Sequence, residues 1–179
     1  MIITVLIVIV GLIVGLVILI AMQPTDFRIT RSAAIPASAA DIFEEVNDFH
    51  RWNAWSPWAR MDPTAKNTFE GAASGEGAKF RWAGNNQVGE GRMTIMESRP
   101  VELIRIKLEF LKPFQATNAA EFTFKPSGDQ TVVTWSMSGK NSFVSKAFVL
   151  VMNCDKMIGG QFEKGLENLK SVVAVTANR

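Results

Sequence analysis

The sequence predicts an α+β fold: an antiparallel sheet covered on one face by a long C-terminal helix, preceded by one N-terminal transmembrane helix. Three observations lead to this prediction. The first 22 residues carry no charged side chain. Segments with strand-like alternation follow, separated by short turns, and the last part of the chain repeats its apolar residues at the helical period. At 179 residues, the chain is long enough for one domain with a substantial core.

Residues 1–22 form an apolar run that is long enough to cross a membrane. Only Thr4, Gly11 and Gly15 interrupt it. A helix of this length measures roughly 33 Å, which matches a hydrocarbon core of about 30 Å. A cleaved signal peptide is the alternative, but no Lys or Arg precedes the run and IAMQP is a poor cleavage site. We therefore expect an uncleaved, single-pass anchor.

The span also suggests an orientation and a partner. Arg28 and Arg31 follow the span and nothing basic precedes it, so the positive-inside rule favours a cytoplasmic C-terminal domain. Gly11 and Gly15 have the spacing that lets two membrane helices approach closely, which suggests a homodimer through the span. The alternative is that glycine is simply common in membrane helices.

The expected organisation is an anchor over 1–22, a linker over 23–26, one domain over 27–174 and a tail over 175–179. Because the linker reaches only about 10–15 Å even when extended, the domain should sit against the membrane surface. The formal net charge is +2 and no Lys/Arg-rich run exists, so nucleic acid is not an expected partner. The single cysteine, Cys154, excludes an internal disulfide.

The domain begins with a strand and two short helices. Residues 27–35 alternate as a first strand. Ser38 as N-cap with Asp41 three residues later predicts the start of an amphipathic helix over 39–50. A second helical turn over 50–55 should end before Pro57, because the residue preceding a proline is disfavoured in the α region.

Five further segments alternate with the period of a strand. They cover residues 77–84, 91–98, 102–110, 119–125 and 131–139. Turn-forming residues separate them, and such short connections predict an antiparallel meander. One face of this sheet should be apolar and the other charged. By the same alternation, Glu97 shares the apolar face with Met93 and Ile95.

Residues 143–174 are expected to form one long helix whose apolar stripe covers the sheet. Gly159 and Gly160 lie in its middle. Each glycine costs roughly 1 kcal/mol of helix stability relative to alanine. Two of them together suggest a bend or a close approach of the helix to the sheet.

Three segments carry a resemblance to a known family: IPASAADIFEEVNDFHRWNAWSPW (35–58), Gly89-Glu90-Gly91, and MNCDKMIGGQFEKGLENLK (152–170). With the order of elements, they resemble the START/Bet v 1-like (SRPBCC) superfamily, specifically membrane-anchored bacterial proteins of the polyketide cyclase/dehydratase type. The resemblance implies a helix-grip fold, in which a curved sheet wraps around the long helix and leaves a hydrophobic tunnel. The superfamily spans lipid carriers, plant allergens, cyclases, ring-hydroxylase subunits and chaperone activators, so the fold does not set the function.

Trp52, Trp55 and Trp58 recur every three residues, which suggests either a cap on the core or the wall of a ligand entrance or membrane contact. In a tunnel of the expected kind, the inward-facing residues would bind the ligand. The expected set is Trp52, Trp55, Trp58, Phe80, Trp82, Ile106, Phe110, Phe122, Phe124, Trp135, Met137, Cys154 and Ile158.

Catalytic and metal chemistry has little support in the sequence. His50 is the only histidine, and with one cysteine elsewhere it cannot build a conventional zinc site. No cofactor motif is present, and no metal or cofactor is expected. His50 and an inward-facing Glu97 are the candidate acid or base residues. The alternatives are a surface histidine and a strand-end carboxylate that turns back to water.

Three functions fit these expectations. The leading hypothesis is a membrane-tethered, non-enzymatic protein that holds a hydrophobic small molecule or lipid between the sheet and the long helix. The second is a cyclase/dehydratase-like enzyme. The third is a protein-interaction module similar to the chaperone activators. A continuous apolar cavity would favour the first, a convergent polar pair inside it the second, and a filled core the third.

Overall fold

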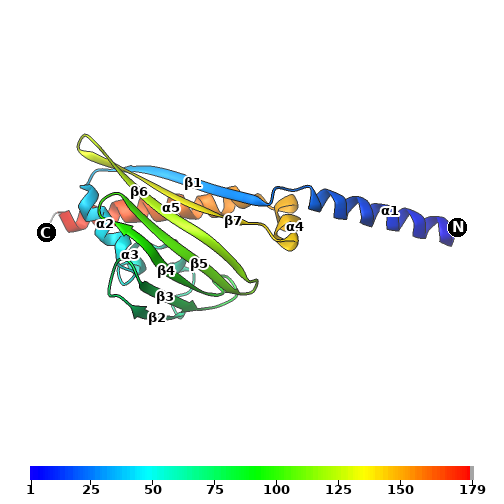
Figure 1. Cartoon of the computed structure of the whole chain (residues 1–179), viewed down its shortest axis with the longest axis horizontal. Coiled ribbons are helices and arrows are strands. Elements are labelled where there is room, and N and C mark those ends of the chain that lie inside the picture. Colours follow the sequence, from blue (N-terminus) through cyan, green and yellow to red (C-terminus); the bar gives the residue numbers. More distant parts are fainter. Residues whose placement is uncertain (178–179) are drawn as a thin grey trace.

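The computed structural model describes residues 1–177 and shows an exposed N-terminal helix leading into an α+β domain (Figure 1). Its elements are α1 (Ile2–Ala21), β1 (Asp26–Ile35), α2 (Ala39–Asn47), α3 (Trp52–Trp55), the 3₁₀ helix η1 (Pro57–Arg60), β2 (Lys66–Gly71), β3 (Ala78–Ala83), β4 (Glu90–Arg99), β5 (Leu103–Lys112), β6 (Ala116–Ser127), β7 (Gln130–Lys140), α4 (Phe143–Val151) and α5 (Cys154–Ala177). Within the expected tail, residues 175–177 continue α5, and residues 178–179 lie outside the described residues.

The seven strands form one antiparallel sheet in the order β1-β7-β6-β5-β4-β3-β2. The predicted meander is confirmed, with β1 closing against the last strand. The sequence did not predict β2. This edge strand is exposed along its whole length and Phe69 is its one large apolar residue, so it has no apolar alternation to recognise.

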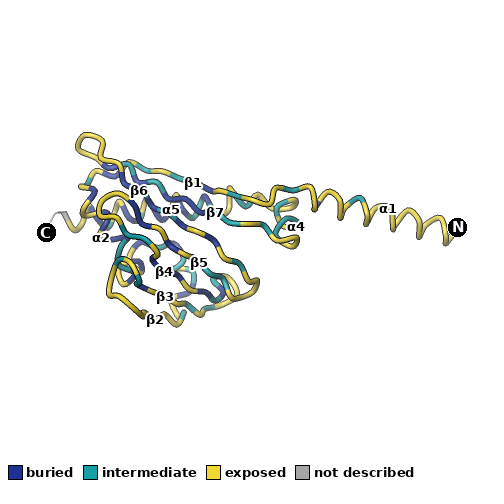
Figure 2. The backbone as a smooth tube through the Cα atoms, viewed as in Figure 1, coloured by how far each residue is buried: buried dark blue, intermediate teal, exposed yellow. Residues whose placement is uncertain are grey.

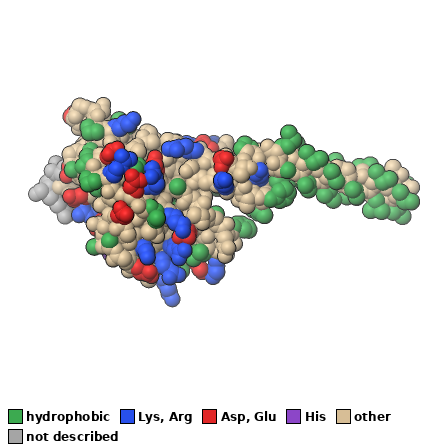
Figure 3. All heavy atoms as spheres, in the orientation of Figure 1, with side chains coloured by type: hydrophobic (Ala, Val, Ile, Leu, Met, Phe, Trp, Pro, Cys, Tyr) green, Lys and Arg blue, Asp and Glu red, His purple; other side chains and the backbone are tan. Residues whose placement is uncertain are grey.

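The helices cover one face of the sheet, which we call the inner face (Figure 1). α5 packs against β1, α2, α3 and η1. The buried positions lie between this helical layer and the sheet (Figure 2). The other face, the outer face, carries most of the charged side chains of the strands (Figure 3). The predicted fold class, with its long C-terminal helix against a curved sheet, is confirmed.

The start of α2 follows the sequence prediction. The Ser38 hydroxyl accepts a hydrogen bond from the Asp41 backbone N–H at 3.1 Å and donates to the Asp41 carboxylate at 2.6 Å. This local contact satisfies one of the amide groups that a helix leaves unpaired at its first turn.

The prediction that Glu97 faces inward is wrong because β4 contains a β-bulge. Ile95 pairs with Ile106, yet Glu97 pairs with Arg105, so Met96 is the extra residue. A bulge of one residue exchanges the faces of every side chain that follows it. Glu97 therefore lies on the outer face, where Arg105 donates a hydrogen bond to its carboxylate and Arg99 lies 3.2 Å away.

The single C-terminal helix expected over 143–174 is also wrong, because the chain forms α4 and α5 instead. Met152 between them is extended, with φ −120° and ψ 133°. The side chain of Asn153 then accepts a hydrogen bond from the Lys156 backbone N–H at 2.9 Å, as an N-cap does. The local capping preference of asparagine thus interrupts the apolar stripe.

The two glycines lie within α5, and the close approach that they suggested is real. A Cβ on Gly159 would collide with the guanidinium of Arg31 from β1, whereas a Cβ on Gly160 would meet nothing. Arg31 Nε donates to Glu163 at 2.7 Å and Arg31 Nη2 donates to Asp155 at 2.9 Å. Gly159 therefore makes room for an arginine that joins the first strand to the helix.

This difference predicts opposite effects for two neighbouring substitutions. Gly160→Ala should raise the free energy of unfolding by about 0.5–1 kcal/mol, because alanine favours a helix. Gly159→Ala should bring no such gain, because Arg31 must leave its partners. Urea denaturation measures both. In an Arg31→Ala background the gain from Gly159→Ala should reappear, and equal gains in the native background would contradict the explanation.

Candidate ligand-binding surface

The half of the domain farthest from α1, here the distal half, has a filled core. Trp52 and Trp55 are buried there. The indole N–H of Trp52 donates to the Val46 carbonyl at 2.9 Å, and that of Trp55 donates to the Glu45 carbonyl at 3.2 Å. Both rings meet Phe122 of the sheet edge-on. Their hydrogen bonds and ring contacts are those of core residues that attach α3 to the sheet.

Trp135 of β7 is the centre of this aromatic core. Its ring stacks on Phe162 of α5, with centroids 4.2 Å apart and an interplanar angle of 7°, and on Phe122 at 4.7 Å. Trp58 meets it edge-on at 5.7 Å. Nε1 of Trp135 is buried and has no hydrogen-bond partner within residues 1–177. An unsatisfied buried donor costs roughly 1–3 kcal/mol.

The half of the inner face nearest α1 is covered less completely. The strand ends that meet there are the starts of β1, β2, β4 and β6 and the ends of β3, β5 and β7. α5 packs along the β1 side of the sheet. Six apolar side chains remain only half-buried in this region, and we call them the proximal apolar surface: Phe27, Trp58, Trp82, Leu108, Phe110 and Ile158.

Trp82 and Phe110 are fixed in place on this surface. The indole N–H of Trp82 donates to the Val88 carbonyl at 3.0 Å. The ring lies over Gly91 of β4, where any Cβ would collide with it. Phe110 meets Trp82 edge-on at 6.0 Å. The glycine thus lets a large, half-exposed ring lie flat on the sheet.

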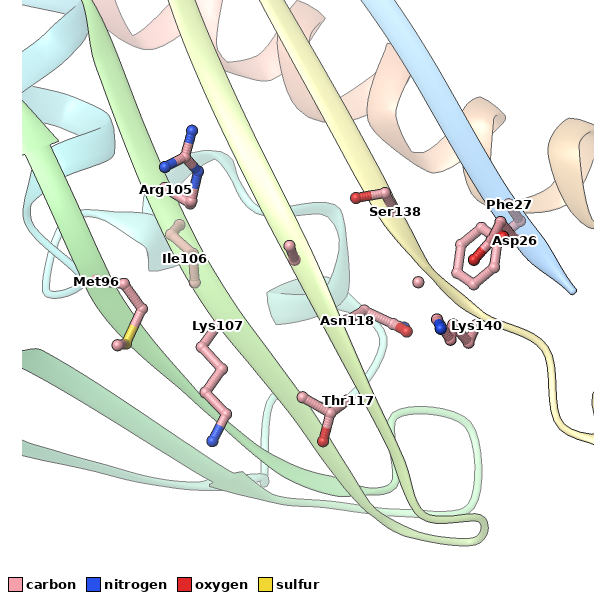
Figure 4. A pocket seen from close by; sticks show the side chains of 12 residues that line it. Asp26, Phe27, Met96, Arg105, Ile106, Lys107, Thr117, Asn118, Ser138 and Lys140 are labelled. Carbon is pink, nitrogen blue, oxygen red and sulfur yellow. The ribbon is translucent and has the colours of Figure 1, made fainter.

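Two hollows are open on the outer face instead. One of about 590 Å³ crosses β1, β7, β6, β5 and β4, and another of about 310 Å³ lies over β2 to β5. Figure 4 shows Arg105 and Lys107 beside the first hollow, with the helices behind the sheet. Neither hollow lies between the sheet and α5, where the family resemblance implied a tunnel.

Ion pairs tie neighbouring strands together on the outer face. Arg92 donates two hydrogen bonds to Glu109, at 2.7 and 2.9 Å, and Lys107 Nζ lies 3.0 Å from the same carboxylate. These contacts lower the pKa of Glu109 from 4.5 to about 2, and the hydrogen bonds from Arg92 contribute the largest part of the shift. The carboxylate is well shielded within the strand surface, with 14% of its side chain exposed.

The lowered pKa of Glu109 predicts a specific acid sensitivity. Because the pKa is lower in the folded state, its contribution to stability is full above about pH 4.5 and is lost as the pH falls towards 2. Glu109→Gln should therefore be less stable than the native chain at pH 7, and the difference should shrink across this window. Urea denaturation at a series of pH values measures it. A difference that stays constant down to pH 2 would contradict the assignment.

The residues expected to bind a ligand fall into two groups. Trp52, Trp55, Ile106, Phe122, Phe124, Trp135 and Met137 are buried, whereas Trp58, Phe80, Trp82, Phe110, Cys154 and Ile158 are half-buried. The structure thus separates a packed group from a partly accessible group that lies mostly nearer α1. Their role in binding stays a prediction.

The two candidate acid or base residues lie apart from the inner face. His50 is exposed, with its Nδ1 2.8 Å from Asp48 and its ring stacked on Phe69 at 4.1 Å. Glu97 belongs to the outer-face network described above. Within residues 1–177, no group of three or more His, Cys, Asp or Glu side chains is placed to hold a metal ion.

A family model described as polyketide cyclase / dehydrase and lipid transport matches residues 26–174, nearly the whole domain. The chain belongs to this family. No curated protein sequence matches this member of the polyketide cyclase/dehydrase and lipid transport family. Family membership supports a ligand-binding or cyclase-like role in general terms.

Solved structures resemble this family member in fold. A Staphylococcus aureus protein of unknown function, SA2116, is 12% identical with a TM-score of 0.63, over 86% of this chain and 97% of that one. The Aha1 dimer from Colwellia psychrerythraea is 14% identical with a TM-score of 0.58, over 82% and 96%. The di-domain ARO/CYC StfQ of the steffimycin biosynthetic pathway is 10% identical with a TM-score of 0.62, over 87% and 53%. At such identities the similarity shows the fold alone.

Sequence reasoning left two residues of this family member's inner face out of the candidate site. Leu108 belongs to the proximal apolar surface, and it follows Ile106 by two residues in β5, so the strand alternation places it on the inner face. Asn118 is buried on the same face, two residues before Ala120 in β6, and its Nδ2 approaches the Met137 sulfur at 3.9 Å. A polar residue at an inward position of an apolar strand is a signal that could have identified it.

Proposed function

We propose that this protein binds a hydrophobic small molecule or lipid on the proximal apolar surface while α1 holds it at a membrane. The observation that carries the proposal is the half-burial of six large apolar side chains on the inner face, next to a fully packed distal half. Apolar groups that water still reaches gain free energy when a ligand covers them, at roughly 25 cal/mol per Å².

The arrangement matches what a carrier requires. Its walls are aromatic and aliphatic, and the buried side chain of Asn118 is a polar group on the same face. A few placed polar groups in an apolar surrounding orient a ligand without catalysing a reaction. His50 and Glu97 point elsewhere, so the proposal assigns no catalytic step to either.

The tether rests on the properties of α1. The helix has 20 residues, a mean hydropathy of 3.4 in its most apolar window and no buried share in that window. A signal sequence near an N-terminus passes the same test of length and composition. Its 20 residues exceed the apolar core of a signal peptide, roughly 7–15 residues, and this length supports an anchor that is kept. The cytoplasmic location of the domain, based on Arg28 and Arg31, stays a prediction.

A homodimer through α1 is part of the same proposal. Gly11 and Gly15 have nothing within 4 Å of the position that a Cβ would take, so a second helix can approach there. The Aha1 dimer, which shares the fold, is compatible with pairing.

Binding is tested with the full chain purified in mild detergent and titrated with a fluorescent fatty acid. Phe110→Ser should weaken binding by about tenfold, because burying a Phe side chain fully is worth roughly 1.5–3 kcal/mol and half of this one is already buried. Met96→Ser is the matched control, since Met96 is an exposed apolar residue on the outer face. This control should leave the affinity unchanged.

Native mass spectrometry of the same preparations identifies a bound lipid directly. An equal loss of affinity in both variants would place the probe somewhere other than the proximal apolar surface. A native chain that binds neither probe nor lipid would overturn the proposal and favour the protein-interaction alternative.

A further inference from the structure

A second apolar region lies where α1 joins the domain. None of the nine residues of α4 is buried. Phe114, on the turn between β5 and β6, is 59% exposed and meets the ring of Phe148 at 5.9 Å. Val151 at the end of α4 is 87% exposed. We call these and their neighbours the junction patch: Phe114, Phe143, Phe148, Leu150, Val151 and Met152.

The junction patch is held next to the end of α1 (Figure 1). Lys146 Nζ of α4 donates to the Ala21 carbonyl at 3.3 Å. Just before α4, the Asn141 backbone N–H donates to the Thr25 carbonyl at 2.6 Å and its side chain donates to the Pro24 carbonyl at 3.2 Å. A 20-residue helix is about as long as a hydrocarbon core is thick, so a spanning α1 ends at the membrane surface and brings the patch with it.

The charges around the patch suit a lipid surface. Residues 143–152 contain Lys146 and no acidic residue, and residues 111–116 contain Lys112, whose Nζ is paired with Glu90 at 2.7 Å. Helices that lie in the headgroup region combine an exposed apolar side with lysine or arginine. Anionic headgroups attract such cations by about 1 kcal/mol each.

We propose that α4 and the β5–β6 turn form a second membrane contact that lies in the headgroup region beside the end of α1. The occupant of the junction patch is therefore lipid. This inference rests on the proposed membrane anchor but not on the proposed ligand. A single short linker would leave the domain free to rotate, whereas two contacts fix its orientation. The half of the inner face that carries Trp82 and Phe110 then lies nearer the bilayer than the distal half does.

The test uses the full chain reconstituted in vesicles of an equimolar mixture of phosphatidylcholine and phosphatidylglycerol. Cys154→Ala removes the one native cysteine, and an environment-sensitive fluorophore is attached to single cysteines. The sites are Val151→Cys and Phe114→Cys in the patch, Leu12→Cys within α1, and Asp129→Cys on the distant β6–β7 turn. Spin-labelled lipids with the nitroxide near the headgroup or near the chain end quench each label according to its depth. A thermal melt checks that each variant is folded.

Labels at positions 151 and 114 should emit at shorter wavelength and be quenched mostly by the shallow nitroxide, as expected about 5–10 Å into the boundary. The label at position 12 should be quenched mostly by the deep nitroxide, and the label at position 129 by neither.

Quenching at 12 without quenching at 151 and 114 would overturn the second contact and leave the anchor intact. A label at 151 that emits at shorter wavelength yet resists both nitroxides would show that a second copy covers the patch, which also overturns the proposal. The absence of quenching at position 12 would reject the anchor itself.

Discussion

Trp135→Ala is expected to lower the free energy of unfolding by about 3–5 kcal/mol, the range for large aromatic side chains removed from a packed core. The ring is 3% exposed and is stacked between Phe162 and Phe122. Removing it takes away the contact that joins α5 to the middle of the sheet. Trp58 also loses its neighbour. No other element replaces this volume, because the surrounding side chains are held by their own strands and helices.

Urea denaturation followed by far-ultraviolet circular dichroism measures the loss, and Trp135→Phe is the matched control. Phenylalanine keeps much of the ring volume and removes the unpaired indole N–H, so its two effects oppose each other and the net loss should stay below about 1.5 kcal/mol. If the indole N–H serves a bound ligand, Trp135→Phe should also weaken binding of the fluorescent fatty acid. A Trp135→Phe loss as large as that of Trp135→Ala would contradict the expectation that removing the unpaired N–H offsets the lost ring volume.

The features predicted correctly from the sequence are those that depend on local periodicity. The alternation within β1 and β3 to β7 repeats a simple pattern several times, the apolar run of residues 1–22 is continuous, and the Ser38 cap is a local contact within four residues. Each pattern is tied to one backbone geometry, so elements and faces follow from it. The sequence did not predict β2, because an exposed edge strand needs no apolar face.

The failed predictions have causes that are not periodic. A single extra residue, Met96, turned Glu97 to the other face. A single capping side chain, Asn153, divided an apolar stripe into α4 and α5. Alternation shows that a side chain points inward, but it does not show whether the space there is occupied. Trp52 and Trp135 fill that space in the distal half, and this depends on how α3 and α5 pack in three dimensions.

Removing residues 1–22 should move the protein from the membrane fraction to the soluble fraction almost completely. Apolar residues at the centre of a span each favour insertion by about 0.3–0.6 kcal/mol, so a run of this length supplies roughly 5–10 kcal/mol. The junction patch alone gives only a shallow contact, which is weaker and reversible. Ile20 is the one buried residue of α1, so the shortened chain should keep the fold and thermal stability of the domain.

Membrane fractionation with an alkaline carbonate wash measures this change, and Val8→Arg with Leu12→Arg is a matched control that keeps the chain length. Two arginines near the centre of the span oppose insertion by about 2.5–3.5 kcal/mol each, so this variant should also leave the membrane. The intact mass of the native membrane-bound protein then separates the remaining explanations. A mass that includes residues 1–22 supports the anchor. A soluble native protein that lacks them would identify α1 as a cleaved signal sequence. In that case α1 would not hold the junction patch at a membrane.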